Sequence, residues 1–592
     1  MTTERPWEGL AGRDLALLAG FALAVFCFSL VGGRPLTMHE ARLPQTAREM
    51  LSGGDWVIPR CGGRPWLERP PLPIWITAGV GFVFGGEATE WIYRIPSALC
   101  GCGVVLMTGW MAGRWFGRTV GLLTGLMLAT MFEFVSYAWL AEQDIFLCAA
   151  VTGAIALFVR AELSGGPAEG PRPMEHPLGR RSWAVLLLFV VLGLTNLAKG
   201  LAFGTAMALI PMAGFLLANR DRKGILRYLW VWGWAVFLLI SLAWPLVAYL
   251  HYPDVLDLWK FDHFGRLSGA YASITQAPWY YLIQLPGELA PWTPVALIGL
   301  VLACRRAFTV RRSPESFLLC WAVLPIVVFS IPPGKHHHYL LSCLPPWSVL
   351  AGLGLVWVRD RVFALPQRAR HPLIPLAVLG MGGGIALWLL APLLHAPTWA
   401  RIAAVVAWPL CVAAFGLGLY RRNGRTMMAS LLLVIVTGYF GLHAFYLPRS
   451  DQTAEDTRFL RKVPSVVQPG VPLMINADAS MALDVFRVQF YLPDSAVTLH
   501  NLTWLLDEAI TAPEVYVVAR ARQELELRRY GALAPVLQSR RSRRETSPAD
   551  RLTLFHLAFR RDLKRYPRPK HVSPMQAMSR EPGPNLGGDR SE

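Results

Sequence analysis

The sequence predicts an all-α polytopic membrane protein, with a smaller α/β domain after the last membrane segment. Of the 592 residues, 54% are hydrophobic and only 16% are charged, whereas soluble domains carry about a quarter charged residues. The apolar residues also form runs long enough to cross a hydrocarbon layer of about 30 Å. From residue 449 onward the pattern changes to short strands and helices, which predicts the second domain.

The apolar runs are numerous enough to predict about 13 transmembrane helices. Only helices can supply so many, because each segment must satisfy its own backbone hydrogen bonds in lipid. The first run lacks a small-residue cleavage site, so we expect it to be a membrane span and not a signal peptide. The runs lie at 15–33, 95–113, 119–139, 145–159, 182–198, 200–219, 228–250, 289–304, 316–334, 339–358, 372–395, 402–420 and 426–447.

Basic residues cluster in alternate loops and predict the orientation. With a cytoplasmic N-terminus and 13 spans, all of these clusters fall on the cytoplasmic side, as the positive-inside rule requires. We therefore expect a multi-pass protein of the cytoplasmic (inner) membrane. The net charge of +18 follows from topology, so nucleic acid is not an expected partner.

Three regions follow from this orientation. Residues 1–448 form the membrane domain, 449–562 a soluble extracytoplasmic α/β domain, and 563–592 a disordered tail rich in Pro, Gly and Ser. In the second region "PLMINA", "EVYVVARA" and "RLTLFHLAF" predict strands, and "ARQELELRRYG" predicts a helix that stops at glycine.

The outer side carries two long loops, 34–94 and 251–288. The first contains two segments, 39–52 and 72–86, that are expected to be helices along the membrane surface. Loop 34–94 also contains seven arginines, against the usual charge distribution. An anionic ligand is the simplest explanation for these cations.

Ionisable residues gather near the outer ends of separate spans. An outer carboxylate can accept the proton of an attacking hydroxyl or amine, and outer cations can neutralise a phosphate leaving group. Each residue alone also has a structural explanation, such as ending a helix or reaching the headgroups. The group consists of His39, Glu40, Asp144, Lys199, Arg266 and Lys335.

At these residues the chain resembles the polyprenyl-phosphate-dependent membrane glycosyltransferases of the GT-C superfamily. That superfamily includes the lipid A aminoarabinose transferases and the protein O-mannosyltransferases, and the likeness covers most of residues 13–447 in order. The matching outer-loop motifs are His39-Glu40-Ala41-Arg42, Arg48-Glu49-Met50, Gly54-Asp55-Trp56 and Glu68-Arg69-Pro70-Pro71. Further matches are "RIPSAL" (94–99), Asp144, "LAKG" (197–200), "HFGRLSG" (263–269), "PWT" (291–293), "GKHHHYLLSCLPP" (334–346) and "QFYL" (489–492).

The resemblance implies an enzyme that moves a sugar from a polyprenyl phosphate to a glycolipid, glycan or protein on the outer face, with inversion. It assigns catalysis to Glu40, His39 and Asp144. It implies donor-phosphate binding by five cations and donor or acceptor contact by five further residues. The cations are Lys199, Arg266, Arg69, Arg42 and Lys335. The contact residues are His336, His337, His338, Tyr339 and Glu68.

The first of these motifs departs from the family, whose leading acid is aspartate where this chain has His39. Three interpretations stay open. Glu40 takes over the carboxylate role, or neutral His39 is itself the base, or the enzyme is altered or inactive.

A bound metal ion and functions other than sugar transfer are less favoured by the sequence. Consecutive histidines rarely converge on one ion, so hydrogen bonding by 336–338 is favoured over a divalent metal, and no cofactor is expected. A transporter or flippase is the alternative function. It would show mid-membrane charges and repeated halves, and neither is evident. A structural assembly protein is a third class, and a monomer is expected.

Overall fold

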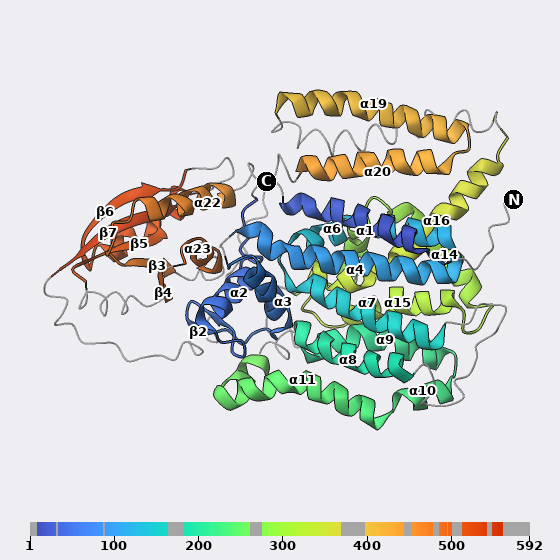
Figure 1. Cartoon of the computed structure of the whole chain (residues 1–592), viewed down its shortest axis with the longest axis horizontal. Helices are drawn as coiled ribbons and strands as arrows, with labels where there is room; N and C mark the ends of the chain where they lie inside the picture. Colours follow the sequence, from blue (N-terminus) through green and yellow to red (C-terminus); the bar gives the residue numbers. More distant parts are fainter. Residues whose placement is uncertain are drawn as a thin grey trace. The chain divides into compact units, whose positions relative to one another are not determined.

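The computed structural model describes residues 9–30, 34–86, 89–163, 182–260, 275–366, 368, 397–442, 452–477, 485–493, 495–499, 512–540 and 547–560. The chain forms two compact units (Figure 1). The helical unit comprises Met1–Ser29, Glu68–Pro73 and Arg94–Phe445. The sheet unit comprises Leu30–Leu67, Ile74–Tyr93 and Tyr446–Glu592. We describe each unit by itself.

Apolar helices build the helical unit. Each predicted apolar run coincides with one or two helices, except 372–395, which lies outside the described residues. The helices are α1 (Gly12–Phe26), α4 (Glu90–Phe116), α5 (Arg118–Leu128), α6 (Phe132–Trp139), α7 (Gln143–Glu162), α8 (Ser182–Lys199), α9 (Leu201–Ala218), α10 (Arg222–Tyr228), α11 (Val231–His251), α13 (Tyr280–Glu288), α14 (Thr293–Ala307), α15 (Pro314–Ser330), the 3-10 helix η3 (His337–Cys343), α16 (Leu344–Ala364), α19 (Thr398–Tyr420) and α20 (Gly424–Gly441).

Five helical stretches in the described part are long and apolar enough to cross a membrane. The number rises to seven if each of two bent pairs is one span. The α5–α6 pair bends by 61° and the α13–α14 pair by 116°. Several other helices are apolar but shorter, so the described residues support a multi-pass protein without fixing the number of crossings.

Glycines allow some helices to approach backbone to backbone. A Cβ on Gly299 of α14 would overlap the carbonyl oxygen of Leu350 on α16. A Cβ on Gly354 of α16 would likewise overlap the carbonyl of Val295. Small residues at such contacts are typical of membrane helices, where close packing replaces the hydrophobic effect as the driving force.

A mixed five-stranded sheet forms the core of the sheet unit, in the order β4-β3-β5-β7-β6. Strand β3 pairs in parallel with β4 and β5, whereas β7 pairs antiparallel with β5 and β6. The strands predicted at 472–477, 514–521 and 551–559 are confirmed as β3, β5 and β7. The bounds are β3 (Leu473–Ala477), β4 (Ala496–Leu499), β5 (Glu514–Arg520), β6 (Gly531–Gln538) and β7 (Leu552–Phe559), with helices α22 (Gln452–Lys462), α23 (Val485–Tyr491) and α25 (Glu524–Leu527).

Residues 34–67 belong to the same unit and pack against α23. They form helix α2 (Arg42–Gly53) and a small hairpin of β1 (Arg60–Cys61) and β2 (Arg64–Pro65). The guanidinium of Arg48 donates to the carbonyls of Phe490 at 2.8 Å and Gln489 at 3.1 Å. Both carbonyls belong to the last turn of α23, and that of Gln489 also accepts from the Leu492 N–H at 3.2 Å. Arg48 therefore joins the "REM" and "QFYL" motifs, which are more than 400 residues apart.

The remaining loop motifs have local structural roles as well. Glu49 accepts hydrogen bonds from the backbone N–H groups of Gly62 and Gly63 in the hairpin turn. Gly54 ends α2 with a left-handed φ of 70°. Asp55 then accepts from the N–H groups of Val57 and Ile58. Some of the charged residues in loop 34–94 thus stabilise the structure of the loop itself.

Candidate active site

An ion pair between Asp144 and Lys199 is the centre of the site in the helical unit. Asp144 lies in the first turn of α7, and Lys199 is the last residue of α8. The side chains are only 12% and 7% exposed, and the ammonium donates directly to the carboxylate. A buried charge needs such a partner, and the N-terminus of α7 also favours the carboxylate.

Two aromatic rings lie next to each other beside the Lys199 ammonium. Its Nζ atom lies 5.1 Å from the ring centre of Phe203 and 5.1 Å from that of Tyr339. The two rings are themselves 4.5 Å apart. A cation next to aromatic faces is stabilised by their quadrupoles. The structure therefore brings together Asp144, Lys199 and Tyr339 from three elements.

The triple histidine adds three side chains with different neighbours. The His336 and His338 rings stack at 5.0 Å. His337 makes a 2.7 Å contact between its Nδ1 atom and a carboxylate oxygen of Glu133. Glu133 was visible in the sequence only as an interruption of an apolar run. His338 lies close enough to Asp144 to interact with it electrostatically.

Other predicted cations in the helical unit differ in their surroundings. Arg69 also acts electrostatically on Asp144, and the neighbouring Glu68 is half-buried. The Lys335 side chain is buried and donates to the Gln276 carbonyl at 3.1 Å, and its burial lowers its pKa. Arg266 lies outside the described residues.

A second buried carboxyl near the histidines was missed by sequence reasoning. Glu288, the last residue of α13, is 4% exposed. In the described part of the chain, neither of its carboxylate oxygens has a hydrogen-bond partner. Its electrostatic interaction with Tyr137 places it near His337, because the Tyr137 ring lies 6.3 Å from that histidine. In the sequence, Glu288 was distinguished only as the last residue of the predicted outer loop 251–288.

Glu40, in the sheet unit, has a local partner that the sequence motif could have revealed. The Thr37 hydroxyl accepts from the Glu40 backbone N–H at 3.1 Å, and the Glu40 carboxylate accepts from the Thr37 N–H at 3.2 Å. This reciprocal pair is a capping box with the pattern Thr-x-x-Glu. Glu40 is fully buried. Its carboxylate therefore stabilises the turn that leads into α2, whatever else it does.

His39 and Arg42 lie beside this capping box. The His39 position is exposed, yet the surrounding protein removes part of its hydration. This desolvation and the charge of Arg42 lower the His39 pKa. The Arg42 guanidinium lies 5.9 Å from the centre of the Phe486 ring on α23. A neutral His39 can accept a proton at neutral pH.

Among the residues that the structure describes, no group of three or more His, Cys, Asp or Glu side chains is arranged to hold a metal ion. The three consecutive histidines point to different neighbours: one contacts Glu133, and the other two stack on each other.

Residues 40–259 match the model of the dolichyl-phosphate-mannose-protein mannosyltransferase family. An undecaprenyl phosphate-alpha-4-amino-4-deoxy-L-arabinose arabinosyl transferase from Sodalis glossinidius is 29% identical over 68% of this chain and 69% of its own length. A relative of the same name from Yersinia enterocolitica is 24% identical over 73% of this chain and 76% of its own length.

Two solved structures have a similar fold. ArnT from Cupriavidus metallidurans, bound to undecaprenyl phosphate, has a TM-score of 0.70 at 21% identity and covers 92% of this chain and 98% of its own. An oligosaccharyltransferase from Archaeoglobus fulgidus has a TM-score of 0.52 at 12% identity, over 88% and 70% of the two chains.

The family model and the relatives indicate a membrane protein of the transferase class, and not a transporter. The predicted resemblance to polyprenyl-phosphate glycosyltransferases of the GT-C superfamily is confirmed by the matching family model and by these relatives. The protein is a glycosyltransferase. The mostly helical membrane architecture is confirmed as well.

Proposed function

We propose that this protein transfers a sugar from a polyprenyl-phosphate donor to an acceptor on the outer face of the cytoplasmic membrane. The observation that carries the proposal is the buried Asp144–Lys199 pair, which lies beside two aromatic rings at one end of α7 and α8. The relatives named for undecaprenyl-phosphate donors support the same class of donor. The acceptor is a lipid A-like glycolipid, another glycan or a protein.

Lys199 is proposed to bind the donor phosphate. Its ammonium can neutralise the charge that develops on the phosphate when the bond to the sugar breaks. Asp144 holds the ammonium in place before the donor binds, and Arg69 and Arg266 are proposed as further cations for the phosphate. Tyr339 and the histidines 336–338 are proposed to contact the sugar.

The transfer step is a single displacement. The acceptor oxygen or nitrogen attacks the anomeric carbon on the face opposite the phosphate, and the carbon–oxygen bond to the phosphate breaks. Polyprenyl phosphate leaves with the bonding electrons, and the anomeric configuration inverts. A base must take the acceptor's proton. Glu40 is our first candidate and neutral His39 the second, because a carboxylate and a neutral imidazole are both possible general bases.

The proposed topology has 13 spans and a cytoplasmic N-terminus. The α/β domain at 449–562 is then extracytoplasmic, and a monomer is sufficient for the reaction. The alternating clusters of Lys and Arg along the sequence support this orientation. Cysteine labelling of a cysteine-free variant from the outside tests it: a probe at exposed Arg425 should stay protected, and one at exposed Leu525 should react.

A transfer assay tests the proposed chemistry. Purified protein is given a radiolabelled sugar on undecaprenyl phosphate, together with membrane lipids as acceptor. We expect label to move to the acceptor, and we expect Lys199→Gln to lose at least about 100-fold of the activity. Arg425→Gln, which removes an exposed cation elsewhere, is the matched control and should retain it. Equal activity in Lys199→Gln and wild type would contradict the proposed role of Lys199.

A further inference from the structure

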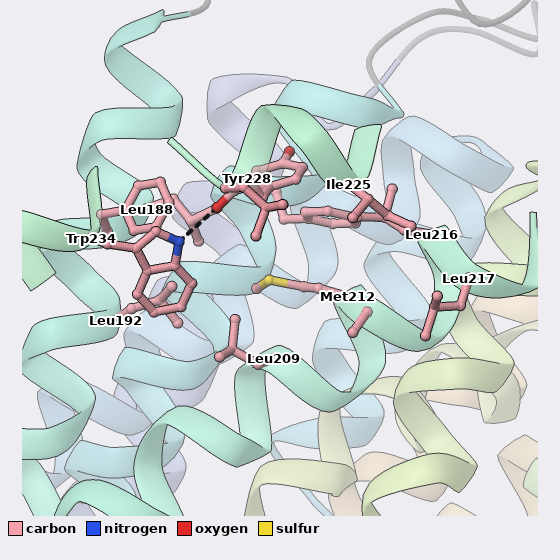
Figure 2. Close-up of a pocket in the computed structure, with 13 residues that line it drawn as sticks. Leu188, Leu192, Leu209, Met212, Leu216, Leu217, Ile225, Tyr228 and Trp234 are labelled. Atoms are coloured by element: carbon pink, nitrogen blue, oxygen red, sulfur yellow. Dashed lines mark hydrogen bonds between the residues drawn. The ribbon is translucent and has the colours of Figure 1, made fainter. Parts of the chain in front are cut away.

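The helical unit contains an apolar cavity that the proposed transfer reaction does not use. Its volume is about 280 Å³, and it lies among α7, α8, α9, α10 and the start of α11. Figure 2 shows the side chains of Leu188, Leu192, Leu209 and Met212 around this space, with Ile225 and Tyr228 beside them. Side chains of this kind offer a hydrocarbon surface to a ligand.

The few polar groups of the cavity wall are occupied by other protein groups. The Trp234 indole N–H donates to the Tyr228 carbonyl at 2.8 Å, the dashed line in Figure 2. The Tyr228 hydroxyl donates to Glu162 at 2.8 Å. The cavity therefore has no polar group to offer a sugar or a phosphate, and its occupant must be hydrocarbon.

Three cations precede the cavity-lining residues of α10 directly in the sequence. Arg220, Arg222 and Lys223 are all exposed and lie in the turn before α10 or in its first residues. The next turn of α10 supplies Ile225, Tyr228 and Leu229 to the cavity wall. In the part of the chain that the structure describes, none of these three cations forms an ion pair.

Two acids of the described residues in this region, Asp221 and Glu162, are already ion-paired. Asp221 pairs with Arg312 at 2.7 Å. Glu162 pairs with Arg227 and, at 2.9 Å, with Arg312. The positive charge of Arg220, Arg222 and Lys223 is therefore available to a ligand from outside the protein.

Exposed apolar side chains continue the cavity toward the surface. Leu217 and Leu229, which line the cavity, are 64% and 59% exposed. Val231 and Trp232, at the start of α11, are more than 70% exposed. In a membrane protein such a surface faces lipid, so a lipid chain can enter the cavity from the bilayer.

We propose that this cavity binds one acyl chain of an anionic glycerophospholipid, whose phosphate headgroup contacts Arg220, Arg222 and Lys223. An apolar cavity next to exposed cations fits one molecule that has both a hydrocarbon chain and a negatively charged headgroup. Juxtamembrane cations attract anionic lipids in this way.

The donor's polyprenyl chain is a poorer match for this place. Lys199 is at one end of α8, and Leu188 is eleven residues nearer the other end, which is roughly 16 Å along a helix. A polyprenyl monophosphate has a single anionic end, which the proposed function places at Lys199. The cations beside α10 need an anion of their own, and a phospholipid supplies one. The inference goes beyond the proposed function and needs no transfer activity.

Native mass spectrometry of the full-length protein tests this proposal. The detergent-solubilised protein is incubated with phosphatidylglycerol or with phosphatidylcholine of the same acyl chains. We expect phosphatidylglycerol to be retained preferentially. The double variant Arg222→Gln/Lys223→Gln should reduce this preference about 10- to 30-fold, since each cation near an anionic headgroup contributes about a factor of five.

Two further variants make the result specific. Ala213→Trp places a large ring at the cavity wall without removing a buried side chain, and it should reduce retention of both lipids. Arg421→Gln/Arg425→Gln removes two exposed cations beside α20 and should leave the preference unchanged.

Three outcomes would overturn the proposal. One is equal retention of the two lipids by the wild type. Another is an equal loss of preference in the Arg421→Gln/Arg425→Gln control. The third is displacement of phosphatidylglycerol by undecaprenyl phosphate in the Lys199→Gln variant, which would assign the cavity to the donor's chain.

Discussion

Replacing Glu40 by glutamine separates two roles of this carboxylate. In the structure Glu40 is fully buried and accepts from the Thr37 N–H, so it caps the turn before α2. A glutamine side chain can accept the same hydrogen bond, because capping boxes use either residue. A glutamine cannot take a proton from an acceptor. The substitution therefore keeps the cap and removes the base.

The two roles differ in the quantity that they affect. Loss of a general base lowers turnover about 10²- to 10⁴-fold, which is about 3–5 kcal/mol of activation free energy. Loss of a cap lowers the free energy of unfolding by about 0.5–2 kcal/mol. If Glu40 is the base, Glu40→Gln should lose at least 100-fold of the transfer rate with a change in stability below about 1 kcal/mol.

The control for the cap is Thr37→Ala. It removes the hydroxyl that accepts from the Glu40 N–H but keeps the carboxylate. It should lower the melting temperature and retain transfer in the fraction that stays folded. The assay is transfer of radiolabelled sugar in detergent, with a thermal melt of each variant.

Full activity in Glu40→Gln would refute the assignment and leave Glu40 as a cap only. A loss of more than 100-fold in His39→Ala would then identify His39 as the base. Retention of activity in both variants would exclude both residues.

Three other predictions follow from the described contacts. Lys199→Met leaves Asp144 buried without its partner, so we expect the free energy of unfolding to fall by about 3–5 kcal/mol. Adding Asp144→Asn should restore much of the melting temperature but none of the transfer activity. An unchanged stability of the single variant would contradict the ion pair. Arg48→Met removes two hydrogen bonds to the end of α23 and should lower the free energy of unfolding by about 2–3 kcal/mol. The control is Arg60→Met, which removes a surface ion pair with Asp55 at 3.7 Å and should lower it by less than about 1 kcal/mol in the same melt. Because the folded state lowers the pKa of His39, the unfolded chain binds a proton at this histidine at a higher pH than the folded chain does. The stability that depends on a neutral His39 is therefore complete above about pH 6.5 and is lost as the pH falls through the folded-state pKa. His39→Gln should flatten the decline in melting temperature between about pH 6.5 and 5, and an unchanged pH profile would show that this histidine titrates normally.

The helices and strands were largely predictable because their signals are local. Apolar runs between charges predicted the helices of the helical unit, and short β-rich segments predicted β3, β5 and β7. The candidate phosphate-binding pair was found through residues at the ends of two runs, Asp144 and Lys199. Charges at such positions are visible without knowledge of the tertiary structure.

Other features depend on contacts between distant parts of the chain. The sequence around Arg48 does not indicate that its guanidinium binds carbonyls at the end of a helix more than 400 residues away. The pairing of His337 with Glu133 and the burial of Glu288 depend on how helices pack. The Thr37–Glu40 capping box differs, because its spacing is local. It was overlooked because the Glu40 position suggested catalysis first.

The measurement that tests the central claim most directly is sugar transfer by the purified, full-length protein. Undecaprenyl phosphate carrying a radiolabelled sugar is the donor, and the lipids and proteins of the native membrane are the acceptors. We predict time-dependent appearance of label in an acceptor, release of undecaprenyl phosphate in equal amount, and loss of both in Lys199→Gln. Absence of transfer from a series of polyprenyl-phosphate sugars, in protein whose fold is verified by its melting transition, would contradict the proposed function.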